Sequence, residues 1–82
     1  MRVPRDVDGR KLASLLARFG YQGTRQTGSH IRLTSTAKGG EHHVTVPAHK
    51  TLKVGTLASI LTEVARYLDV ERAQLIRDLF EP

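Results

Sequence analysis

Apolar side chains recur three and four residues apart in three stretches of the chain, which is the spacing of one face of an α-helix. These stretches predict helices over residues 9–19, 53–67 and 70–80. The apolar positions are, in chain order, Leu12, Leu15, Leu16 and Phe19; Leu57, Ile60, Leu61, Val64 and Leu68; and Leu75, Ile76, Leu79 and Phe80. Each stripe leaves a polar face, so each helix is expected to pack one side against a core.

Residues at the predicted helix ends are typical of caps. Asp8 is placed to cap the N-terminus of the first helix, and Asp69 that of the third. Gly20 follows the first apolar stripe, where a glycine commonly ends a helix, and Tyr21 is then expected to fold back on Leu16.

Between the first two helices the pattern changes to a period of two residues, which predicts strands over residues 21–26, 30–34 and 42–46. A turn at 27–29 and a loop at 35–41 separate them, Gly23 is a candidate bulge, and Pro47 ends the third strand. The residues expected to face the core are Ile31, Leu33, Val44 and Val46, and those on the opposite face are His30, Arg32, Thr34, His43 and Thr45.

These elements predict a single α+β domain over residues 1–82, ordered α-β-β-β-α with an additional C-terminal helix. Short connections favour a three-stranded antiparallel sheet. Because the apolar strand positions share one side, the helices are expected on one face of the sheet, leaving the other face open. This layout resembles the double-stranded-RNA-binding fold.

The distribution of charge along the chain indicates a partner. Residues 1–62 hold ten Lys and Arg against three Asp and Glu, whereas residues 63–82 hold three against five. A basic surface around the predicted strands and loops suits a polyanion such as RNA, although a charge of this size is also typical of a domain that is merely soluble.

Other composition features exclude several classes of protein. The chain has no cysteine, so a disulfide framework and a thiolate zinc site are excluded. No apolar run approaches the roughly 20 residues of a membrane span, and the N-terminus lacks the apolar region of a signal peptide. The sequence therefore predicts a cytoplasmic protein with no membrane partner.

The stretch Arg25 to His30 carries the candidate chemistry. A histidine and Arg32 on one exposed sheet face, beside the turn at Gly28, suit the handling of a phosphodiester. The same pattern is also typical of a solvated strand face.

Several segments together resemble the HicA toxins of bacterial type II toxin–antitoxin systems. They are Asp8 to Leu12, Phe19 to Tyr21, Arg25 to His30, Val44 to His49, Gly55 to Leu57 with Ile60-Leu61, and the final helix. The order Gly28-Ser29-His30, then Val46-Pro47-Ala48-His49, then Gly55-Thr56-Leu57 is more specific than any one piece. The resemblance implies an endoribonuclease that cleaves mRNA, uses no cofactor and is neutralised by a cognate HicB-like antitoxin. It also assigns the catalytic histidine to His30.

Imidazole suits that role because its ordinary pKa, near 6.5, allows it to accept or donate a proton near neutral pH. Whether His30 would act as the base or the acid stays open. His43 shares its predicted face and His49 matches a family position, so both are auxiliary candidates. His42 and His43 point to opposite faces, and no histidine spacing matches a metal site. Ser29 and His30 diverge as strand neighbours, which argues against a nucleophile–base pair.

RNA-binding candidates lie on either side of the histidine. Lys50, Lys53 and Thr56 cluster at the start of the second long helix, where free N–H groups attract anions. An ordinary helix start with solvated lysines would look the same. Arg25, Ser29 and Arg32 complete the predicted RNA-binding set.

Two other functions are compatible with this sequence. One is a non-catalytic RNA-binding module on the same fold, in which His30 only stacks or forms hydrogen bonds. The other is an interaction domain whose open sheet face binds a protein.

Overall fold

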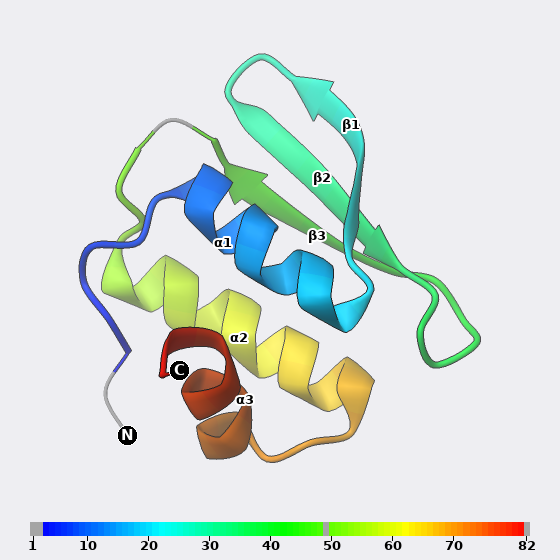
Figure 1. The fold of residues 1–82 in the computed structure, drawn as a ribbon. Helices are drawn as coiled ribbons and strands as arrows, with labels where there is room; N and C mark the ends of the chain where they lie inside the picture. Colours follow the sequence, from blue (N-terminus) through cyan, green and yellow to red (C-terminus); the bar gives the residue numbers. More distant parts are fainter. Residues whose placement is uncertain (1–2, 49, 82) are drawn as a thin grey trace.

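The computed structural model describes residues 3–48 and 50–81 (Figure 1). The elements are α1 (Gly9–Leu16), β1 (Gln22–Thr27), β2 (His30–Ser35), β3 (His42–Pro47), α2 (Val54–Leu68) and α3 (Arg72–Phe80). This order confirms the predicted α+β fold with an additional C-terminal helix. No helix within the described ranges has both the length and the apolar character needed to cross a membrane.

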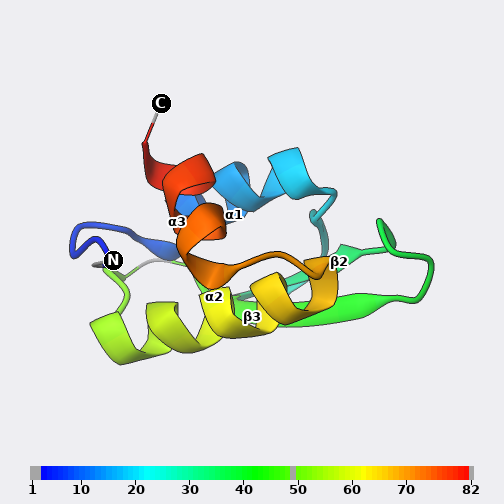
Figure 2. The ribbon, with the colours of Figure 1, turned by 90° about the horizontal axis from the view of Figure 1, so that it is seen from below.

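The three strands form one antiparallel sheet in the order β1-β2-β3. Ile31 lies opposite Val46 and Leu33 lies opposite Val44, so the apolar strand positions share one face, as predicted. In Figure 1 α1 lies in front of the strands with α2 running alongside it, and Figure 2 shows α1 and α3 on the same side of the strands. The opposite sheet face is open, since His30, His43 and Thr45 are exposed.

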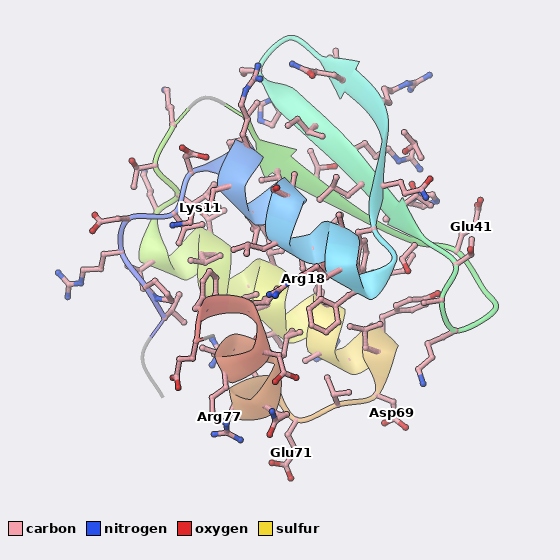
Figure 3. All side chains as sticks on the ribbon, in the orientation of Figure 1. Lys11, Arg18, Glu41, Asp69, Glu71 and Arg77 are labelled. Atoms are coloured by element: carbon pink, nitrogen blue, oxygen red, sulfur yellow. The ribbon has the colours of Figure 1, made fainter. Side chains whose placement is uncertain are left out.

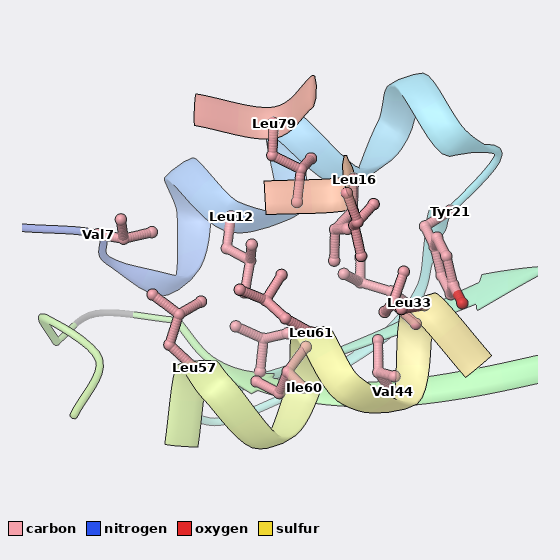
Figure 4. Packing of buried hydrophobic residues seen from close by; sticks show 14 of the residues in the cluster. Val7, Leu12, Leu16, Tyr21, Leu33, Val44, Leu57, Ile60, Leu61 and Leu79 are labelled. Atoms are coloured by element: carbon pink, nitrogen blue, oxygen red, sulfur yellow. The ribbon is translucent and has the colours of Figure 1, made fainter. Parts of the chain in front are cut away.

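The core lies where α1, α2, α3 and the sheet meet (Figure 4). Leucines from α1, α2 and α3 are fully buried there, together with side chains from β2 and β3. The central members are Leu12, Leu16, Leu33, Val46, Leu57, Leu61, Val64 and Leu75. Burying such a side chain contributes about 1.5–3 kcal/mol to the free energy of unfolding, which is why the apolar stripes decide the fold.

The start of α1 and the end of the 3-10 turn that follows it have the predicted caps. The N–H of Lys11 donates to Asp8 Oδ1 at 2.8 Å. After one 3-10 turn at Ala17–Phe19 the chain reverses at Gly20, whose φ is +87°. The N–H of Tyr21 then donates to the carbonyl oxygen of Leu16 at 3.3 Å, so the tyrosine folds back as expected.

The predicted cap at Asp69 is wrong. Asp69 ends α2 in the left-handed conformation, with φ +58°, and Glu71 precedes the first residue of α3. The N–H groups of Asp69 and Val70 donate to carbonyls of the last turn of α2. Aspartate is one of the few residue types other than glycine that adopts this conformation readily, so it ends one helix here and does not begin the next.

Strand β1 begins one residue later than predicted, because the N–H of Tyr21 donates to the carbonyl oxygen of Leu16 in the chain reversal and not to a neighbouring strand. The predicted bulge is confirmed: the register of β1 against β2 shifts between Gly23 and Arg25. A bulge twists an edge strand and disrupts its ladder, which disfavours pairing with a further strand.

Helix α3 is fastened to the rest of the domain by apolar packing and by Arg18. Leu75, Ile76 and Leu79 are buried. The Arg18 guanidinium, which points from the 3-10 turn after α1 towards α3 (Figure 3), donates to the carbonyl oxygens of Asp78 at 2.7 Å and Leu79 at 3.3 Å. These carbonyls lie in the last turn of α3, so the arginine caps that helix from a distance.

Candidate functional site

His30 is placed by a tight turn between β1 and β2. Thr27 pairs with His30, so only Gly28 and Ser29 connect the two strands. Gly28 has φ +55°, a conformation that glycine adopts at little cost and that two-residue hairpin turns require. The histidine is therefore the first residue of β2, and its side chain is exposed on the open face.

The imidazole of His30 borders a hollow of about 280 Å³. Its lining residues are Ser29, His30, Pro47 and Lys50, and Pro47 lies directly opposite His30 in the ladder between β2 and β3. His30 Nδ1 is 3.5 Å from Ser29 Oγ. That separation is longer than the roughly 2.6–3.2 Å expected of a nucleophile and its base, so the geometry gives no support to a Ser29–His30 pair.

A second hollow, of about 230 Å³, continues this surface towards the start of α2. It is lined by Pro47, Lys50, Thr51, Leu52, Lys53 and Thr56. The two hollows share Pro47 and Lys50, so the structure places the predicted residues Lys53 and Thr56 on the same surface as His30. This grouping could not be read from sequence spacing, because Lys50 comes 20 residues after the histidine. The predicted auxiliary residue His49 lies outside the described residues.

The two predicted arginines lie next to the histidine on the open face. Arg25 is opposite Arg32, and Arg32 is opposite Thr45, so these three residues form a row across the sheet. The adjacent row holds His30, about 7 Å away along β2. Two arginines paired across the ladder make this part of the sheet electropositive and suit it to a phosphate backbone.

His43 is on the same face but is not part of this group. It lies opposite Thr34, four residues along β2 from His30, which is a separation of about 13 Å. Its Nδ1 is 2.7 Å from Thr34 Oγ1, and its Nε2 is 3.6 Å from Glu41 Oε1. His43 is therefore engaged by neighbours at the far end of the sheet.

His42 belongs to an aromatic cluster that the sequence did not predict. Its ring stacks on Tyr67 with centroids 4.8 Å apart and an angle of 11° between the planes. Its Nδ1 is 2.7 Å from the hydroxyl of Tyr21. Burial, followed by the nearby Tyr67 and Glu63, raises the pKa of Tyr21 to about 12, so this hydroxyl stays protonated near neutral pH.

The Tyr67 hydroxyl holds the loop between β2 and β3. It lies 2.5 Å from the carbonyl oxygen of Gly40 and 3.3 Å from that of Ser35, and it accepts the N–H of Lys38. This loop is at the opposite end of β2 from His30, so the aromatic cluster has a structural role distant from the candidate site (Figure 1).

The side chains of the site offer proton transfer and anion binding. Within residues 3–48 and 50–81, no group of three or more histidine, aspartate or glutamate side chains is placed to hold a metal ion. What the structure brings together is one exposed imidazole with lysines, arginines and hydroxyl groups around it. Such a set can hold a phosphodiester and move a proton at it.

A comparison with protein families gives a match. The family model described as HicA toxin of bacterial toxin–antitoxin matches residues 9–65, which is 57 of the 82 residues. The matched segment includes α1, the whole sheet, most of α2 and every residue that lines the two hollows. No curated protein and no solved structure gives a significant match.

Proposed function

Because the chain belongs to the HicA toxin family of bacterial toxin–antitoxin systems, we propose that it is an endoribonuclease that cleaves mRNA with His30. Membership of this family makes the protein a toxin and implies a HicB-like antitoxin as its partner. The observation that supports the nuclease activity is the position of His30: an exposed imidazole at the edge of a hollow that it shares with Lys50.

RNA can be cleaved by its own 2′-hydroxyl when protons are transferred at two oxygens. A base removes the 2′-hydroxyl proton as that oxygen attacks phosphorus, and an acid protonates the 5′-oxygen as its bond to phosphorus breaks. The products are a 2′,3′-cyclic phosphate and a free 5′-hydroxyl. His30 can supply either transfer, and such a transfer typically contributes about 10²- to 10⁴-fold to the rate.

The surrounding residues are suited to hold the RNA. Arg25 and Arg32 would bind phosphates on the strand side of His30, and Lys50 and Lys53 those on the side of α2. Ser29 and Thr56 would donate hydroxyl hydrogen bonds to phosphate or sugar oxygens. The cations on both sides favour a bound strand that passes over His30.

The experiment that tests this function is incubation of the purified protein with single-stranded RNA in excess EDTA. We expect cleavage to persist, because imidazole transfers protons without a metal ion, and we expect a cyclic phosphate at the new 3′ ends. RNA binding without cleavage would contradict the nuclease and favour a non-catalytic RNA-binding module. Loss of cleavage in EDTA, with rescue by one divalent ion, would overturn the mechanism.

Replacing Lys53 with alanine tests the RNA-binding surface. In a His30→Ala background, Lys53→Ala should weaken RNA binding and reduce the slope of log K against log salt by about 0.7, the effect of one phosphate contact. The melting temperature should change little, because the exposed Lys53 side chain makes no hydrogen bond that caps α2.

The matched control for this measurement is Lys38→Ala. Lys38 is also an exposed lysine, but it lies in the loop between β2 and β3, at the other end of the sheet. We expect its replacement to leave the salt slope unchanged. A slope for Lys53→Ala as steep as those of Lys38→Ala and of the His30→Ala background would show that Lys53 does not contact RNA.

A further inference from the structure

The first turn of α1 meets the end of β3 with no room for a side chain at position 9. A Cβ atom on Gly9 would lie 1.6 Å from the carbonyl oxygen of Pro47 and 2.6 Å from its carbonyl carbon. The Val46 Cγ1 atom would be 3.0 Å away. The nearest two of these atoms are backbone, so a side chain here would require α1 or the end of β3 to move. Figure 1 shows the first turn of α1 beside the end of β3.

Pro47 also lines the hollow beside His30. It lies directly opposite His30 across the ladder, and both residues line the hollow. Immediately after it, the N–H of Ala48 donates to the carbonyl oxygen of Ser29 at 2.6 Å. A displacement of Pro47 would therefore be transmitted to His30 by two routes, through the ladder and through Ser29.

The segment before Gly9 contacts the far end of the loop that connects β3 to α2. The N–H of Leu52 donates to the carbonyl oxygen of Val7 at 2.8 Å, and Asp8 forms an isolated bridge with Thr51. Lys50 lies between these contacts and the one at Ala48. The position of this lysine relative to His30 thus depends on how closely α1 approaches β3.

Helix α1 is held in place by its own packing and cap, so its contact with Pro47 can determine the position of the site residues. Leu12 and Leu16 are fully buried, and Asp8 caps the helix through the N–H of Lys11. Adding a methyl group at position 9 would push a rigid helix against a wall of the hollow, and no flexible side chain is available to absorb the change.

We propose that Gly9 is a positioning residue of the candidate site. Its lack of a side chain allows α1 to contact the Pro47 backbone, and this contact sets the distances of Pro47 and Lys50 from His30. The effect on catalysis rests on the proposed nuclease function, whereas the effect on the placement of His30 does not.

The test compares Gly9→Ala with Leu79→Ala, a core substitution in α3 at a residue that lines neither hollow. For each variant we would measure the folded fraction, the single-turnover cleavage rate at saturating RNA and the imidazole NMR signals of His30 and His42. For Gly9→Ala we expect the rate per folded molecule to fall about 10- to 100-fold, as a misplacement near 1 Å can produce. Its His30 signal should move, and its His42 signal should not.

Leu79→Ala should lower the folded fraction while leaving the rate per folded molecule and the His30 signal unchanged. A folded Gly9→Ala protein with the wild-type rate and the wild-type His30 signal would overturn the proposal. So would an equal loss of rate per folded molecule in Leu79→Ala, because the effect would then be a general consequence of destabilisation.

If Gly9→Ala does not fold, Asp8→Ala decides the question. This substitution keeps the glycine and removes only the side-chain cap of α1. The first turn of α1 is then less stable, but it is not pushed away from Pro47. We expect a smaller fall in rate and a changed His30 signal, and a protein with neither change would refute the positioning role. If the wild-type protein does not cleave RNA, the proposed function fails, and the NMR comparison still determines whether Gly9 positions His30.

Discussion

Replacing His30 with alanine is expected to reduce RNA cleavage by at least about 10²-fold and to abolish growth arrest at matched expression. The variant should fold normally, because His30 is exposed and contributes no contact to the core. Gel assays of purified protein on a labelled RNA would measure the rate, and circular dichroism with thermal melting would show that the fold is retained.

The matched control for His30→Ala is His43→Ala. His43 is the same residue type on the same sheet face, but it lies outside the hollow and forms a hydrogen bond with Thr34. We expect it to keep most of the cleavage activity. Undiminished cleavage by His30→Ala would contradict the catalytic role proposed for His30. Equal losses in both variants would indicate that the two histidines act together despite their separation.

The substitution with the largest expected effect on stability is Leu75→Ala in α3. Leu75 is fully buried, and truncating such a leucine typically costs about 2–5 kcal/mol. A domain of this length has a total free energy of unfolding of only about 4–12 kcal/mol, so the variant should be partly unfolded at 37 °C. Chemical denaturation of the purified protein would give the change in the free energy of unfolding.

This result would establish that α3, which lies beyond the segment matched by the family, completes the core. Gln74→Ala is the control, since Gln74 is the exposed neighbour of Leu75 on the same helix and should change the free energy of unfolding by less than about 0.5 kcal/mol. A loss below about 1 kcal/mol for Leu75→Ala would mean that α3 is detached from the domain in solution.

The order and type of the elements were determined by the sequence, because they depend on local periodicity. Leucines three and four residues apart define α1, α2 and α3, and alternating residues define β2 and β3. Each pattern can bury its apolar positions in only one regular conformation, so even the faces of Ile31 and Leu33 were predicted correctly.

The side-chain chemistry of a single residue does not predict a helix boundary where that residue suits two conformations. Asp69 has the side chain of an N-cap, yet it also tolerates the left-handed conformation that ends α2. The packing of Leu68 on one side and Leu75 on the other determines where the helices must stop. The sequence around Asp69 carries no signal that distinguishes the two roles.

The site shows the same division between local and non-local information. The sequence alone predicted the position of His30 on the open face, because the turn at Gly28 and the alternation of β2 place it there. Only the tertiary structure brought Lys50 and Pro47 to that histidine, and only it revealed the contact between Gly9 and Pro47. These contacts join residues far apart in the chain, and their distances depend on how helices pack against the sheet, which no local pattern of residues specifies.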